Sequence, residues 1–143
     1  MKDITQKQST QRRAIAQAVL HAKPETIQAL RAGTLPKGDP LPVAKVAAIQ
    51  AAKNTSQIIP YCHPLQLEHV GVDFKVENDR ITVTVDVSAF YKTGVEMEAL
   101  TAASAAVLTI YDMTKGVDPG MRITDHYLIS KTGGKSDFSA EAA

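Results

Sequence analysis

The chain has 143 residues, and its 16 Lys and Arg against 15 Asp and Glu give a formal net charge of +1. This length is typical of one domain, and a composition of 44% hydrophobic and 22% charged residues excludes a mainly disordered chain. A near-neutral chain is not a general electrostatic binder of nucleic acid. With 5% aromatic residues and no Trp, it also has few side chains on which bases could stack.

Cys62 is the single cysteine, which excludes an internal disulfide and is typical of a reducing compartment. The first residues are charged and lack the apolar stretch of a secretory signal. The longest apolar-leaning run, 99–111, is too short to span a membrane. These features predict a cytoplasmic protein with no membrane segment. They also predict one domain over residues 1–143, flexible at 1–11 and 133–143.

In chain order, residues 12–21 fit a helix and a strand equally well, because their apolar residues match both periods. Residues 24–32 predict a short helix that begins at a proline and is stopped by Gly33. The Gly- and Pro-rich segment 33–42 predicts a loop. Residues 43–58 are rich in Ala at helical spacing and predict a second helix.

Alternating apolar residues over 70–76 and 81–87 predict two strands joined by a turn at Asn78 and Asp79. Residues 95–115 predict a long helix whose centre is Ala-rich, almost uncharged and therefore buried. A last strand is expected over 121–129. This order predicts an α+β fold. It is a ferredoxin-like two-layer sandwich, with an antiparallel sheet packed against helices in a βααββαβ arrangement.

Two acidic groups bracket the 95–115 helix. Asp112 and Lys115 lie three residues apart on one face and can tune a proton donor or acceptor, although a surface ion pair is the more frequent reason for this spacing. Glu96 and Glu98 lie in the first turn, where acids also suit the helix dipole. Glu98 and Asp112 would be ~21 Å apart along one helix. If both act on one substrate, two subunits must supply them, which predicts an interfacial site in an oligomer.

Other candidate motifs are weaker. Cys62 and His63 lie in a turn between prolines, but adjacent side chains usually point apart, which argues against a catalytic dyad. No His spacing indicates a metal site. The sequence at 134–136 resembles the end of a P-loop, yet Ile129 stands where its first Gly is required. The Gly-rich tail or the 33–42 loop could still hold a phosphate, although mobile basic loops are more common. These patterns alone indicate an anion-binding α+β domain.

Several strings in a fixed order point to one family. The most specific are Cys-His-Pro-Leu at 62–65 and Thr-Gly-Val-Glu-Met-Glu-Ala-Leu-Thr at 93–101. The others lie at 37–39, 50–55, 110–115 and 133–136. Together they cover nearly the whole chain, which resembles the molybdenum cofactor biosynthesis protein C family, the cyclic pyranopterin monophosphate synthases.

This resemblance implies a ferredoxin-like lyase that assembles as a homohexamer, a trimer of dimers, with active sites between subunits. Its substrate would be (8S)-3',8-cyclo-7,8-dihydroguanosine 5'-triphosphate, converted to cyclic pyranopterin monophosphate with release of pyrophosphate. No metal or redox cofactor, nucleic acid or membrane partner is expected. Three rivals remain: different nucleotide chemistry on the same fold, a ligand-binding regulatory domain, and a structural partner protein.

The resemblance also implies the roles of individual residues. Asp112 and Lys115 match the catalytic acid–base pair, and Lys37 and Lys131 match lysines suited to the triphosphate. The remaining matched substrate-binding residues are Tyr61, Cys62, His63, Met97, Glu98 and Lys53, to which we add Glu96. A family arginine corresponds to Arg12 or Arg13, and Thr114 stands where the family commonly has Cys.

Overall fold

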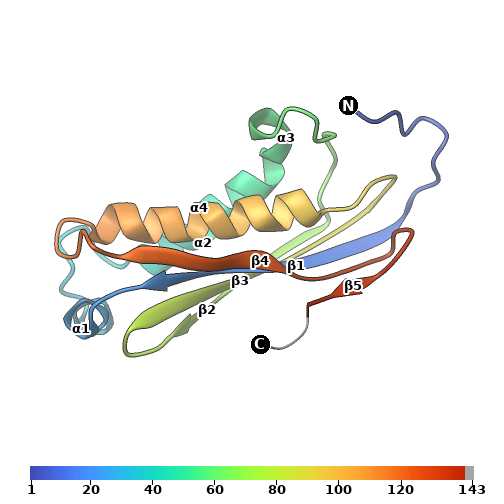
Figure 1. Cartoon of the computed structure of the whole chain (residues 1–143). Coiled ribbons are helices and arrows are strands. Elements are labelled where there is room, and N and C mark those ends of the chain that lie inside the picture. Colours follow the sequence, from blue (N-terminus) through green and yellow to red (C-terminus); the bar gives the residue numbers. More distant parts are fainter. Residues whose placement is uncertain (141–143) are drawn as a thin grey trace.

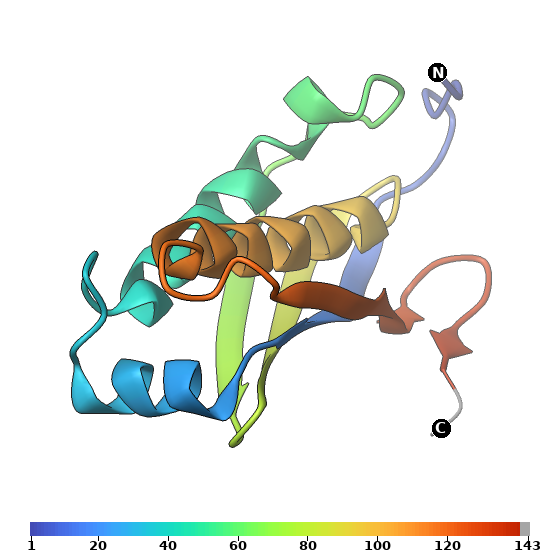
Figure 2. The same cartoon turned by 60° about the vertical axis from the view of Figure 1, so that its left-hand side comes forward.

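The computed structural model describes residues 1–140, which form an antiparallel sheet with α2 and α4 lying side by side across one face (Figures 1 and 2). The elements in chain order are β1 (Thr10–His21), α1 (Pro24–Ala32), α2 (Pro40–Lys53), α3 (Thr55–Ile58), β2 (His69–Val76), β3 (Arg80–Tyr91), α4 (Glu96–Thr114), β4 (Arg122–Thr132) and β5 (Phe138–Ser139). The sheet order is β2-β3-β1-β4-β5, and all neighbouring strands are antiparallel. This confirms the predicted α+β sandwich, since the ferredoxin-like plan supplies the first four strands.

The ambiguous segment 12–21 is a strand, and it belongs to β1 at the centre of the sheet. It pairs with β3 on one side and with β4 on the other. Ala14, Ala16 and Ala18 point to one face and are fully buried. Hydrogen bonding to two neighbours satisfies the backbone on both sides, so long-range pairing decides between strand and helix here.

The first helix is confirmed, and the loop after it is shorter than predicted. α1 ends at Gly33, whose φ of 71° lies in the left-handed region that glycine adopts without strain. α2 already begins at Pro40, inside the predicted 33–42 loop. The Asp39 carboxylate accepts a hydrogen bond from the Leu41 amide at 3.0 Å, so an N-cap starts the helix there.

The predicted 43–58 helix is interrupted at Asn54. The backbone of Asn54 leaves the helical region, with φ −112° and ψ 15°. Its side-chain amide donates to the Gln50 carbonyl at 2.8 Å, and the Thr55 hydroxyl donates to the Ala51 carbonyl at 2.9 Å. These side chains satisfy carbonyls at the end of α2, and α3 then begins at Thr55.

The long central helix is confirmed within one residue at each end. α4 packs against α2, β1 and β3, and its small residues Ala99, Ala102, Ala103 and Ala106 are fully buried. Alanines on facing elements permit this close approach. Among residues 1–140, no helix combines the length and apolar character that crossing a membrane requires.

The remaining strands agree with the sequence except at the C-terminal end. The predicted hairpin is confirmed as β2 and β3, paired in register from His69 to Val76. β4 continues past the predicted 121–129, and the Gly-rich tail turns back as β5, where Phe138 pairs with Lys131. Residues 141–143 lie outside the described residues, so the flexibility of the 133–143 tail stays a prediction.

Candidate active site

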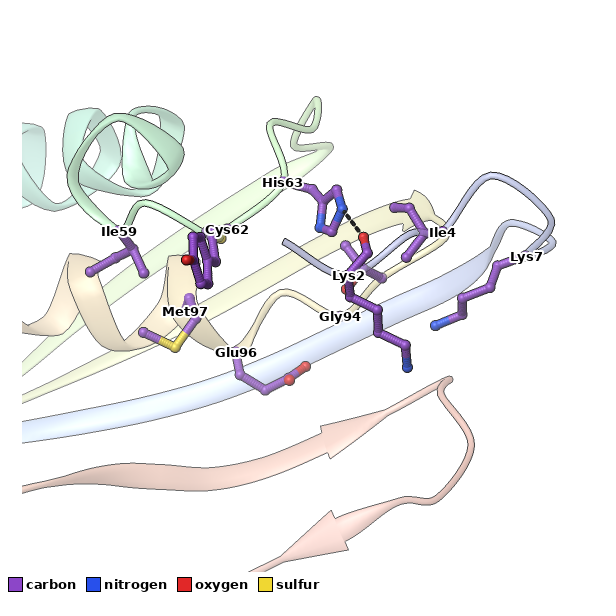
Figure 3. Close-up of a pocket in the computed structure, with 11 residues that line it drawn as sticks. Lys2, Ile4, Lys7, Ile59, Cys62, His63, Gly94, Glu96 and Met97 are labelled. Atoms are coloured by element: carbon purple, nitrogen blue, oxygen red, sulfur yellow. Dashed lines mark hydrogen bonds between the residues drawn. The ribbon is translucent and has the colours of Figure 1, made fainter.

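A pocket of about 360 Å³ with a mixed polar and apolar lining, here called the mixed pocket, opens at the N-terminal end of α4 (Figure 3). Its walls come from three distant parts of the chain: residues 2–7, the turn at 59–63 and residues 93–97. Of the predicted substrate-binding residues, the lining includes Tyr61, Cys62, His63, Glu96 and Met97. The fold therefore brings the Cys-His-Pro-Leu turn and the head of α4 together, as the resemblance implies.

Cys62 and His63 point in different directions, as their adjacency predicts. The Cys62 thiol lies 3.8 and 4.0 Å from the two carboxylate oxygens of Glu98. His63 Nε2 lies 2.8 Å from the carbonyl oxygen of Lys2 (Figure 3). Because a carbonyl only accepts, Nε2 must be the donor in this contact. The turn thus supplies two independent groups and no dyad.

Glu98 is buried beneath the turn, with 3% of its surface exposed. Burial raises the pKa of Glu98 to about 7, and the nearby Glu96 charge adds to this effect. Burial and the Glu98 charge raise the pKa of Cys62 to about 11. The thiol is therefore protonated at neutral pH and donates to the carboxylate, which excludes an activated thiolate in this environment.

A second, more polar cavity of about 250 Å³ adjoins the first and shares Lys2, Lys7 and Glu96 with it. Its cationic lining residues are Lys2, Lys7, Arg12, Lys131 and Lys135. Glu96 is the acidic residue of this lining, and its carboxylate lies 4.0 Å from the Lys131 amine. Partial burial and the charges of Arg12, Lys2 and Lys135 lower the pKa of Lys7. Such an excess of positive charge favours an anion.

Arg12, not Arg13, is the arginine of this cavity. Strand alternation places the two side chains on opposite faces of β1. Arg13 forms an ion pair with Asp86, with Nε 2.9 Å from Oδ1. Arg12 is 8% exposed and donates through Nη2 to the Lys92 carbonyl at 3.3 Å, while its buried Nε has no partner among the described residues. This guanidinium is available to a ligand.

Two glycines allow the turn between β4 and β5 to close against Arg12. Gly133 has φ 93°, and a Cβ there would lie 1.8 Å from the Gln11 carbonyl oxygen. A Cβ on Gly134 would lie 2.7 Å from Arg12 Nη1. Only glycine fits the backbone approach at 133, so Gly133 is a structural requirement of the cavity wall, whereas a side chain at 134 would displace the end of the Arg12 side chain.

The predicted catalytic pair lies at the opposite end of α4. Lys115 Nζ is 3.2 Å from Asp112 Oδ1, and Lys37 Nζ donates to the Asp112 carbonyl at 3.3 Å. The hydrogen bond from Lys115 and the charge of Lys37 lower the pKa of Asp112. Both side chains of the pair are more than half exposed. Along the continuous helix, Asp112 is ~21 Å from Glu98, so one chain does not bring them together.

The remaining predicted site residue is Lys53, which is exposed in the last turn of α2 and lines neither cavity. Sequence reasoning missed Lys2 and Lys7 because it treated the polar segment 1–11 as mobile. A polar coil carries no periodic signal that could have identified them. Within residues 1–140, no group of three or more His, Cys, Asp or Glu side chains is placed to hold a metal ion.

Comparisons with known proteins identify the family of this chain. The sequence model described as the MoaC family matches residues 1–134. This chain belongs to the MoaC family. A Listeria welshimeri protein named cyclic pyranopterin monophosphate synthase is 53% identical over 99% of this chain and 90% of its own. Proteins of that name from Syntrophomonas wolfei and Geobacter metallireducens are 50% and 52% identical over 95% of this chain, and over 88% and 86% of their own. The predicted membership of this enzyme family is confirmed.

Proposed function

We propose that this MoaC-family chain converts (8S)-3',8-cyclo-7,8-dihydroguanosine 5'-triphosphate to cyclic pyranopterin monophosphate and pyrophosphate. The observation that carries this proposal is the pairing of two cavities at the head of α4. One is lined by polar and apolar groups together, and the other by Lys and by Arg12, whose Nε has no hydrogen-bond partner among the described residues. A ring system joined to a triphosphate has the same two-part chemistry, and the relatives' name supports the assignment.

In the proposed reaction, the cationic cavity neutralises the leaving group, and the Asp112–Lys115 pair transfers protons. A substrate oxygen forms a bond to the α-phosphorus, the bond to the bridging oxygen breaks, and pyrophosphate leaves with the electron pair. The cations around Arg12 and Lys131 would neutralise the leaving group. Asp112 would accept the hydroxyl proton, and Lys115 would donate one during ring rearrangement. Covering this exposed pair would desolvate the carboxylate and make it a stronger base.

Two subunits are needed for this chemistry, because the acid–base pair and the cavities lie at opposite ends of α4. An apolar groove of about 420 Å³ runs along α4 next to the mixed pocket. Among its lining residues, Ile58 and Leu108 are 59% and 56% exposed. A second copy of the chain covering this groove would bury them and carry its own Asp112 toward the cavities. We extend this to a homohexamer built as a trimer of dimers, as the resemblance implies.

The activity is tested by anaerobic incubation of the purified chain with the cyclic triphosphate, measuring pyrophosphate and cyclic pyranopterin monophosphate together. Equal amounts of both products are expected. Tight substrate binding with neither product would contradict the reaction and favour a ligand-binding domain instead.

The shared site is tested by mixing two inactive variants, Asp112→Asn and His63→Ala, under conditions that exchange subunits. Random exchange should restore about a quarter of wild-type turnover, because that share of sites combines two intact ends. The matched control mixes Asp112→Asn with Lys115→Ala, which damage the same end and should restore nothing. An absence of recovery in the first mixture, with exchange verified by mass, would contradict the shared site.

A further inference from the structure

Residues 1–9, which precede β1, form no helix or strand, yet several contacts hold them against the site. The side chain of Ile4 is 9% exposed, so it anchors the segment against the protein. The Asp3 carboxylate accepts from the Thr5 amide at 2.9 Å, and the Lys7 amide donates to the Ile4 carbonyl at 3.1 Å, which makes a compact turn. Lys92 Nζ donates to the Thr5 carbonyl at 3.2 Å. We call residues 1–9 the N-terminal strap.

The strap determines how His63 is presented. The Lys2 carbonyl accepts from His63 Nε2 at 2.8 Å, and this contact selects the tautomer that carries its proton on Nε2. The ring is half-buried, and this is the hydrogen bond that the structure gives its nitrogen atoms within residues 1–140. Nδ1 is thereby left as an acceptor toward whatever occupies the pocket.

The strap also adds charge to both cavities. Lys2 and Lys7 line the mixed pocket and the cationic cavity alike. Lys7 lies close enough to Arg12 and Lys135 to be repelled by them. No ion pair joins Lys2 or Lys7 to a carboxylate among the described residues. Like charges gathered without a counter-charge are unfavourable unless an anion is bound.

We propose that the N-terminal strap is a working part of the site: its backbone positions His63, and its Lys7 holds the polyphosphate end of the ligand. This inference rests on the proposed function for the identity of the substrate. The ligand chemistry it requires is a pyrophosphate-like anion. Lys7 contacts the substrate in this arrangement, whereas Ile4 and the Lys2 carbonyl act as positioning groups.

The first test measures pyrophosphate binding by calorimetry on the full chain. Lys7→Ala should weaken binding about tenfold, in line with loss of one charge-assisted hydrogen bond, and Lys7→Arg should restore most of it. The matched control is Lys75→Ala, an exposed lysine on the edge strand β2 with a carboxylate no nearer than 3.9 Å. Equal binding by Lys7→Ala and wild type would overturn the role of Lys7, as would an absence of pyrophosphate binding by wild type.

The second test uses Ile4→Asn, which releases the anchor without adding a charge to the pocket that Ile4 lines. Steady-state kinetics should show a raised KM and a lowered kcat, while thermal unfolding of the domain stays close to wild type. Nitrogen NMR of the His63 ring should change from the Nε2-protonated tautomer to a mixture. Retention of a single Nε2-protonated tautomer and unchanged kinetics would overturn the positioning role.

The two tests separate this inference from the proposed reaction. If wild type gives no cyclic pyranopterin monophosphate but binds pyrophosphate in a Lys7-dependent way, the proposed reaction fails and the strap stands. If wild type turns over and Lys7→Ala matches it in KM and in pyrophosphate binding, the strap fails and the reaction stands.

Discussion

The two ends of α4 carry the predicted chemistry in opposite environments. At the N-terminal end Glu98 is 3% exposed, and it lies beneath the Cys62 turn and beside a cation-lined cavity. At the C-terminal end the Asp112 side chain is 62% exposed and makes its ion pair in solvent. One end is therefore enclosed by this chain itself, whereas the other lies open to solvent. Burial raises the carboxyl pKa at the first end, and lysines lower it at the second.

The largest expected effect is on turnover at the exposed end. Asp112→Asn removes the proton acceptor and should lower kcat by roughly 10²–10⁴-fold. Pyrophosphate affinity and the unfolding midpoint should stay near wild type, because the side chain is exposed and lines neither cavity of its own chain. The matched control is Asp73→Asn on the edge strand β2, also exposed and outside both cavities. Near-wild-type kcat in Asp112→Asn would contradict its assignment as the acid–base group.

A smaller effect is expected at the buried end, and it depends on pH. The pKa of Glu98 is about 7 in the folded chain, above its usual 4.5. Between pH 4.5 and pH 7 the folded chain therefore keeps a proton on Glu98 that the unfolded chain has lost. Stability from this group is thus full below about pH 4.5 and is lost as pH rises toward 7. Because glutamine does not ionise, Glu98→Gln removes this pH-dependent loss of stability. Its free energy of unfolding at pH 8 should exceed that of wild type by up to roughly 3 kcal/mol.

Urea unfolding at pH 4.5 and pH 8 measures this difference. The gain from Glu98→Gln should be small at pH 4.5 and appear at pH 8, although turnover should fall because the carboxyl lies at the site. An equal effect of Glu98→Gln at both pH values would show that the pKa of Glu98 is the same in the folded and the unfolded chain. The contrast between the two ends of α4 would then rest on exposure alone.

The smallest effect concerns Thr114, in the last turn of α4. Its hydroxyl oxygen is buried without a hydrogen-bond partner within residues 1–140, and the residue is 3% exposed. Thr114→Val keeps the shape and removes the unsatisfied group, so it should stabilise the chain by about 1 kcal/mol. The matched control is Thr109→Val, because the Thr109 hydroxyl donates to the Ala105 carbonyl at 2.7 Å. Differential scanning calorimetry should show a higher midpoint for Thr114→Val only, and a lower midpoint would refute this account.

Much of the fold follows from local patterns that are strong in this sequence. The alternation in β2 and β3 and the stop at Gly33 each depend on neighbouring residues, and so they were predictable. The start of α2 was missed because its Asp39-Pro40 N-cap lies inside a segment whose Gly and Pro content indicates a loop. The end of α2 was missed because a side-chain cap at Asn54 stops a helix without any proline.

The residue types of the candidate site were predictable from the sequence, but which of these residues lie close together in the fold was not. Adjacency was enough to show that Cys62 and His63 point apart, and the length of α4 was enough to separate Glu98 from Asp112. The choice between Arg12 and Arg13 required the register of β1. Alternation places the two side chains on opposite faces of the strand, but it does not show which face lies at the cavity. Lys2 and Lys7 were missed because a polar coil carries no periodic signal.

By itself, the sequence determined the α+β fold class, the strands and helices with strong periodicity, and the family, because these depend on order along the chain. Only the tertiary structure decided that 12–21 is the central strand and that Arg12 faces the cavity. It alone also placed the strap against His63. Those outcomes arise from pairing and burial between residues far apart in the chain, whose free energy exceeds local preference.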